Sequence, residues 1–164
     1  MILRFKRSER VLTIDNTEKK FVATNQVRNE VNGLRRLHEA KEVIRSVVNG
    51  QWGPPYMPRQ FPLGTWNVLR AEPQRRESPF WPWKIVTDAE QPVNVWALDA
   101  KGGYDHETEQ TALDSGYHLH WTPYNTTHGC IRIGGAYTDE VTALASVVRD
   151  ALKAGEKVQL IVEE

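Results

Sequence analysis

The chain has 164 residues, with 21 basic and 21 acidic side chains, a formal net charge of zero and a single cysteine. Its length predicts one domain, since most domains have about 100–200 residues, and a single cysteine excludes an intrachain disulfide. Zero net charge excludes the cationic footprint typical of nucleic-acid-binding proteins. A hydrophobic fraction of 40% is typical of an ordered globular chain.

The sequence shows no targeting or membrane segment. Charged residues at positions 4, 6, 7, 9 and 10 interrupt any signal-peptide core, which needs about 7–15 apolar residues. No run of about 18 apolar residues occurs either. We therefore expect no transmembrane segment, and no signal peptide is visible in this chain.

The first part of the chain predicts a short β-meander followed by a helix. Residues 2–5, 11–14 and 21–23 are apolar or β-branched, and Asp15-Asn16-Thr17 has the composition of a turn. Over 27–48, apolar residues recur every three or four positions. This period predicts an amphipathic helix.

The middle of the chain predicts loops and strands. Residues 51–83 are rich in Pro, Gly and Trp, which indicates loops, with a strand at 65–69. Two further strands are expected at 84–86 and 92–98, which contain the β-branched or aromatic residues Ile85, Val86, Val93, Val95 and Trp96. Residues 99–115 are polar and contain glycine, which predicts a surface loop or lid.

The last part predicts a strand, a helix and a final strand. Residues 117–121 alternate as in a strand, and 138–154 have an apolar stripe with Thr138 as cap and Gly155 as stop signal. A strand follows at 157–162. The predicted fold class is therefore mostly β, with one or two packed helices at about 27–48 and 138–154.

Four side chains that can bind metals or perform catalysis lie within 13 residues: His118, His120, His128 and Cys130. In a strand, His118 and His120 point to the same face. A histidine can act as general base for a cysteine or raise its thiolate fraction. Gly129 permits a sharp turn, so that the amides of residues 129 and 130 can face a developing oxyanion. Arg132 can hold a carboxylate or the loop. This segment therefore predicts acyl transfer through a thioester.

The hexapeptide Thr127-His-Gly-Cys-Ile-Arg132 resembles the Ser/Thr-His-Gly-Cys-x-Arg/Asn signature of the L,D-transpeptidase (YkuD-type) catalytic domain family. Residues 11–21 resemble the opening strands of that family, and 61–66 resemble its Thr/Ser-Pro-x-Gly-x-aromatic motif. The resemblance implies a β-sandwich or mixed-sheet fold. It also implies that 1–164 is one catalytic domain, with insertions at about 27–50 and 70–116.

The resemblance implies roles for individual residues. Cys130 would be the nucleophile and His120 the base, with His118 as the alternative base. Gly129 would contribute its amide to the oxyanion site, and His128 and Arg132 would support the site. Side chains expected to contact the substrate are Thr127, Trp121, Tyr124 and His118. The implied enzyme is a transpeptidase or carboxypeptidase that acts on peptidoglycan stem peptides, needs no metal or other cofactor and reacts with carbapenems. We expect it in the cell envelope or periplasm, or secreted. If it is a secreted effector, an immunity protein is an expected partner.

Two other interpretations remain open. His118, His120, His128 and Cys130 are ligands that zinc prefers, either in a closed structural site or in a hydrolase with Asp105 or Asp114 as base. Zinc does not account for Thr127, Gly129 or Arg132. Alternatively, the six tryptophans predict a non-catalytic module that binds cell wall, which leaves Cys130 without a role.

Overall fold

The computed structural model describes residues 1–26, 52–53, 60–98 and 104–164. The chain divides into two compact units. Unit 1 contains Met1–Arg28, Arg59–Ala89 and Gly116–Glu164, and unit 2 contains Asn29–Pro58 and Glu90–Ser115. The helix expected over 27–48 lies outside the described residues. Of the insertion expected at about 70–116, the part up to Ala89 belongs to unit 1 and the part from Glu90 to Ser115 to unit 2.

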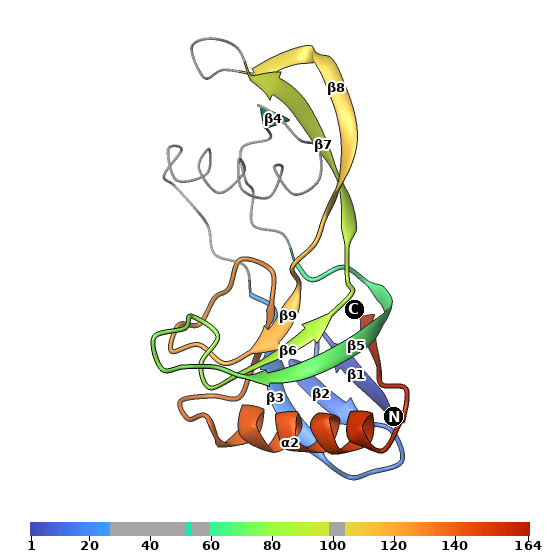
Figure 1. Ribbon diagram of the computed structural model, residues 1–164, viewed down its shortest axis with the longest axis vertical. Helices are drawn as coiled ribbons and strands as arrows, with labels where there is room; N and C mark the ends of the chain where they lie inside the picture. The colour runs from blue at the N-terminus through green and yellow to red at the C-terminus, as the bar shows by residue number, and fades with distance from the viewer. Residues whose placement is uncertain (27–51, 54–59, 99–103) are drawn as a thin grey trace. The chain divides into compact units, whose positions relative to one another are not determined.

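Unit 1 is a closed barrel of eight strands. Around the barrel the strands follow the order β1-β11-β5-β6-β9-β10-β3-β2. Their bounds are β1 Ile2–Lys6, β2 Val11–Ile14, β3 Lys20–Thr24, β5 Gly64–Pro73, β6 Trp83–Thr87, β9 His118–His120, β10 Ile131–Ile133 and β11 Gln159–Glu163. Figure 1 labels β1, β2, β3, β5, β6 and β9 among them. The expected N-terminal meander is confirmed, because β2 pairs antiparallel with both β1 and β3.

The barrel is mixed, and its two parallel pairs position the ends of the chain and the site. β1 runs parallel to β11, so the first and last strands of the chain are neighbours. β9 runs parallel to β10. The mostly β fold with mixed strand directions is thus confirmed, and the strands form a closed barrel where a β-sandwich was the other expectation. The long-range pairing of β1 with β11 closes the sheet on itself, and a closed sheet removes the exposed edges that a sandwich keeps.

The helix α2 (Asp139–Lys153) packs on the barrel and confirms the helix predicted at 138–154. In Figure 1 it runs below strands β2, β3 and β5. Its buried face consists of Val141, Leu144, Ala145, Val148 and Ala151, which join the inward side chains of the strands in one core. Thr138 stands at the N-cap without a side-chain cap bond, whereas Gly155 ends the helix at φ +79°, as expected. Within the described residues no helix is long and apolar enough to cross a membrane.

In unit 2 the structure describes one three-stranded antiparallel sheet. Its order is β4 (Trp52–Gly53), β7 (Gln91–Leu98) and β8 (Tyr104–Asp114). The loop or lid expected at 99–115 is therefore wrong for 104–114. These residues include Asp and Glu, which are depleted in strands, but their backbone is paired with β7 from Gln91↔Asp114 to Leu98↔Tyr104. A cross-strand partner outweighs the weak intrinsic preference of a polar segment.

Candidate functional site

The predicted site residues gather on the outer face of the barrel across β6, β9 and β10. Ile85, Leu119 and Ile131 are register partners and are completely buried, so they line the interior. Side chains alternate along strands, and the flanking residues therefore face outward. They form two rows. The first runs Glu72–Lys84–His120–Arg132, and the second runs Arg70–Val86–His118, with Cys130 next to His118 just before β10.

A tight hydrogen-bonded turn presents Cys130. The Thr127 hydroxyl accepts a bond from the Gly129 amide at 3.2 Å and donates one to the Cys130 carbonyl at 2.6 Å. Gly129 has φ +146°, a conformation that is rare for residues with a side chain. The glycine thus allows the sharp turn, as predicted. To serve an oxyanion, its amide has to exchange the bond to Thr127 for one to the substrate.

The turn is clamped from the other side by Asn25, which sequence reasoning missed. Asn25 directly follows β3 and is 6% exposed. Its side-chain amide donates to the carbonyls of Gly129 and Cys130 at 2.7 and 3.0 Å, and its oxygen accepts the Phe61 amide at 2.6 Å. The only local signal was an asparagine at the end of a strand. Its partners are 104 and 105 residues away in sequence.

The Cys130 thiol is partly buried and makes two main-chain contacts. The His118 amide donates a hydrogen bond to Sγ at 3.4 Å. The thiol in turn donates a hydrogen bond to the Gly116 carbonyl, with 3.8 Å between Sγ and the oxygen. Burial raises the pKa of the thiol to about 11, and the bond from the His118 amide and the charge of Lys84 oppose this rise. The resting thiol therefore keeps its proton at neutral pH, and attack requires a base.

Two neutral histidines provide candidate bases. Burial lowers the pKa of His118 to about 4 and also lowers the pKa of His120. The ring of Phe80, from the loop between β5 and β6, packs edge-to-face on both, with ring centroids 6.1 Å from His118 and 5.0 Å from His120. Their burial therefore has a specific source in the aromatic ring that covers them.

The two histidines differ in how their rings are oriented. Nδ1 of His120 lies 2.8 Å from the Trp121 carbonyl, which can only accept. Nδ1 therefore carries the proton, and Nε2 keeps the lone pair that a base requires. Nδ1 of His118 is buried without a hydrogen-bond partner. By register His118 is nearer to Cys130, but only His120 is oriented by a third group, as in catalytic triads.

The remaining predicted residues are placed around this centre. Arg132 donates to the carbonyls of Thr122 at 2.9 Å and Gly135 at 2.7 Å, so it ties together the loops on either side of β10. The Trp121 indole also donates to Gly135, at 3.0 Å. Tyr124 is 62% exposed. His128 is partly buried within the turn.

The structure offers little support for the zinc interpretation. Within the part of the chain that the structure describes, no three His, Cys, Asp or Glu side chains converge closely enough to hold a metal ion. The four expected ligands are described, but β9 places His118 and His120 beneath Phe80. A zinc site would therefore require these side chains to rearrange.

The tryptophans with described side chains also have packing roles. Trp66, Trp83 and Trp121 are partly buried against the core. Trp81 stands edge-to-face on Trp121, and the guanidinium of Arg76 lies over the Trp81 ring, 5.0 Å from its centroid. The side chains of Trp52 and Trp96 lie outside the described part. The described tryptophans therefore form loop packing, which does not favour a row of exposed rings for sugar binding.

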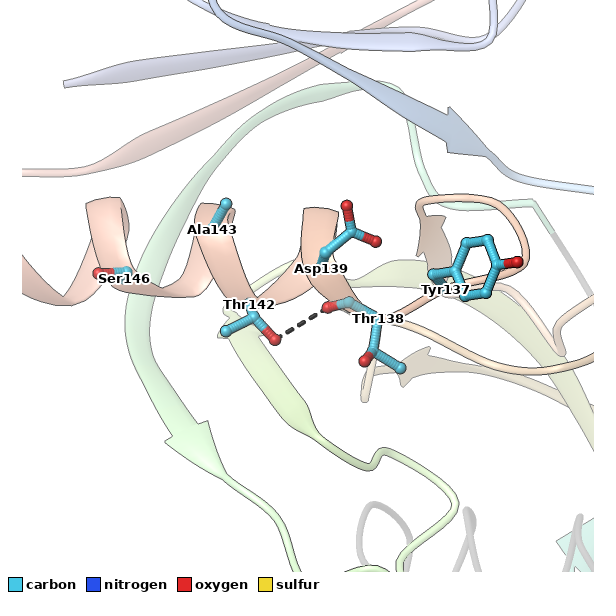
Figure 2. A pocket seen from close by; sticks show the side chains of 6 residues that line it. All are labelled: Tyr137, Thr138, Asp139, Thr142, Ala143 and Ser146. Carbon is cyan, nitrogen blue, oxygen red and sulfur yellow. Dashed lines mark hydrogen bonds between the residues drawn. The ribbon is translucent and has the colours of Figure 1, made fainter.

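A separate surface depression of about 770 Å³ lies along the first half of α2 (Figure 2). It is lined by Tyr137, Thr138, Asp139, Thr142, Ala143 and Ser146. The hydrogen bond drawn there joins the Thr142 hydroxyl to the Thr138 carbonyl at 2.8 Å and belongs to the helix itself. The lining contains no cysteine or histidine, so it does not repeat the combination of side chains found around Cys130.

The comparisons with known proteins add no assignment. No protein-family model matches the chain, and no curated protein and no solved structure matches it. The functional argument therefore rests on the residues and on their geometry.

Proposed function

We propose that the chain is a cysteine acyltransferase, an L,D-transpeptidase or L,D-carboxypeptidase that acts on peptidoglycan stem peptides. One observation carries the proposal. Parallel pairing of β9 with β10 brings a lone cysteine, presented by a glycine turn, beside two neutral histidines, one of which has an oriented ring. The substrate class comes from the resemblance of Thr127–Arg132 to the L,D-transpeptidase signature.

The chemistry follows from the protonation states. Nε2 of His120 takes the proton of the Cys130 thiol as Sγ attacks the carbonyl carbon of the third, L-configured residue of the stem. A C–S bond forms, the amide C–N bond breaks, and the histidine returns the proton to the departing amine of the D-residue. An acceptor amine, or water, then attacks the thioester and regenerates the thiol. Each step conserves protons, because His120 alternates between base and acid.

The turn geometry supports this reaction in a second way. The Cys130 amide and, after release from Thr127, the Gly129 amide are the oxyanion donors of the proposal. Removal of one such donor in related chemistry costs about 3–4 kcal/mol of transition-state stabilisation. Asn25 holds the carbonyls of Gly129 and Cys130 and so keeps these amides in place, while Arg132 ties together the loops before and after β10.

The experiment is a digest of purified tetrapeptide-stem muropeptides, analysed by mass spectrometry. We expect release of the terminal D-residue, with or without formation of cross-linked dimers, which separates carboxypeptidase from transpeptidase activity. Intact-mass spectrometry with a carbapenem should show one covalent adduct on the protein. Cys130→Ser should abolish both signals, and His120→Asn should lower the rate of release by about 100-fold or more.

The controls keep the outcome specific. Circular dichroism establishes that each variant is folded, and Lys20→Met, an exposed change on β3, should leave the activity unchanged. Folded wild type that cleaves no stem, or an adduct that survives Cys130→Ser, contradicts the proposal. Stoichiometric zinc that is lost in His118→Ala would instead favour the metal site.

A further inference from the structure

Lys84 lies on β6, between β9, which carries His120, and β5, which carries Glu72. On β6 it pairs in register with His120 on one side and with Glu72 on the other, on the outer face of the barrel. Its side chain is partly buried. Sequence analysis did not single out this residue, because nothing in Trp83-Lys84-Ile85 distinguishes it from an ordinary strand lysine.

The ammonium group of Lys84 lies over an aromatic ring and forms no ion pair with any described residue. After the hydrogen bond from Arg70, the charge of Lys84 also lowers the pKa of Glu72, its neighbour in register. Nζ lies 4.8 Å from the centroid of the Phe80 ring, the same ring that packs on His118 and His120. No carboxylate among the described residues forms an ion pair with it, since Glu72, its neighbour in register, is bonded to Arg70. A cation–π contact is weaker than a charge-assisted hydrogen bond to a carboxylate. Phe80 therefore orients the ammonium and leaves its donors available.

The other cations of this face are engaged. Arg132 is bonded to two main-chain carbonyls, and Arg70 to Glu72. Lys84 is a partly buried ammonium that forms no ion pair with any described residue and lies on the same barrel face as the proposed nucleophile, so it can bind an anionic ligand. Its positive charge also acts on the thiol, whose pKa it lowers.

We propose that Lys84 anchors a carboxylate subsite, in which its ammonium binds the terminal carboxylate of the residue that leaves the stem peptide. This inference rests on the proposed acyl transfer. It makes the enzyme specific for stems that end at the residue after the scissile bond, because only these present a free carboxylate there. It also predicts discrimination against stems whose terminal carboxyl group is amidated or extended.

The dimensions agree with this assignment. Three bonds separate the scissile carbonyl carbon from the terminal carboxylate carbon of the next residue, a distance of about 4 Å. Lys84 lies on β6 in the row of His120, whereas Cys130 directly precedes β10 and lies in the row of His118. Two strand spacings of about 5 Å and two residues of about 3.3 Å place their backbones about 12 Å apart. The four-carbon stem of the lysine and the leaving residue together span this gap.

The test compares two substrates that differ only at the carboxylate. One is a tetrapeptide stem with a free terminal acid, and the other is its C-terminal amide. We expect wild type to prefer the acid by about 10- to 100-fold in kcat/KM, the range of a hydrogen bond between charged groups. Lys84→Met should remove the preference, and Lys84→Arg should retain much of it.

The ratio of the two substrates separates recognition from effects on the nucleophile. Loss of the Lys84 charge also raises the pKa of the thiol, but this slows both substrates equally and cancels in the ratio. Lys20→Met removes the same charge from an exposed position and should leave the ratio unchanged. A binding measurement on Cys130→Ala protein, with the acid and the amide, should show the same preference without turnover, and Lys84→Met added to it should abolish that preference.

The failures of the two proposals are distinguishable. If wild type cleaves both stems but Lys84→Met leaves the acid-to-amide ratio unchanged, the carboxylate subsite is refuted and the acyl transfer stands. If folded wild type cleaves neither stem and the Cys130→Ala protein binds neither, both proposals are refuted. Equal binding of acid and amide refutes the subsite in either case.

Discussion

Replacement of Asn25 by alanine should destabilise the protein strongly, because it removes three hydrogen bonds at once, two of them buried. The Cys130 carbonyl keeps a partner in the Thr127 hydroxyl at 2.6 Å. The Gly129 carbonyl and the Phe61 amide lose the bonds that Asn25 makes to them. At about 1–3 kcal/mol for each buried group left unpaired, the free energy of unfolding should fall by about 2–6 kcal/mol.

That loss is a large part of the stability of a typical domain, about 5–15 kcal/mol, and is measurable by urea denaturation followed by tryptophan fluorescence. Asn125→Ala, at an exposed position in the loop that precedes Cys130, is the matched control and should change the free energy by less than about 0.5 kcal/mol. If Asn25→Ala changes it no more than this control, the clamp does not contribute as we argue.

Asn25→Asp tests the donor alone. The new carboxylate keeps an oxygen for the Phe61 amide but places a second oxygen against the carbonyls of Gly129 and Cys130. This repulsion should raise the pKa of the introduced carboxyl above the ordinary value of about 3.9. Its protonated form can donate, so the variant should regain stability relative to wild type as the pH falls. A deficit that does not shrink at low pH would refute the donor role.

Two further predictions follow from the shifted pKa values. Because burial, Lys84 and His120 lower the pKa of His118 to about 4, folding favours the neutral ring, and stability should be lost as the pH falls from about 6.5 towards 4. With allowance for solvent screening, wild type should lose about 1–2 kcal/mol more than His118→Gln between pH 7.5 and 5 in urea denaturation, and parallel pH profiles would contradict this. Because burial raises the pKa of Cys130 to about 11, alkylation by iodoacetamide at pH 8 should be about 100-fold slower in the folded protein than in urea, and a rate that levels off below pH 9 would contradict the burial of the thiol.

The local elements of the fold were predictable from the sequence. The meander over β1–β3, the helix α2 and the last strand were expected near their observed positions, because alternation of apolar residues and the stop signal at Gly155 act within a few residues. Strand β8 was missed because it lacks such a local signal. Its polar residues carry little intrinsic preference, and its structure depends on the partner strand β7.

The candidate site divides in the same way. The hexapeptide around Cys130 and the shared face of His118 and His120 are local, so the sequence was sufficient to single them out. The sequence did not identify Asn25 and Lys84 as part of the site, because their partners are distant along the chain. Asn25 meets the turn across 104 residues, and Lys84 meets His120 across 36 positions of sequence through the pairing of β6 with β9.

The sequence by itself therefore determined the single thiol, its glycine turn and the secondary structure on either side of it. Only the tertiary structure decided that the sheet closes into a barrel and that β9 and β10 run side by side. It also decided that Phe80 covers both histidines. The physical reason is that strand pairing and burial depend on the whole chain, and the protonation states of Cys130, His118 and His120 follow from burial.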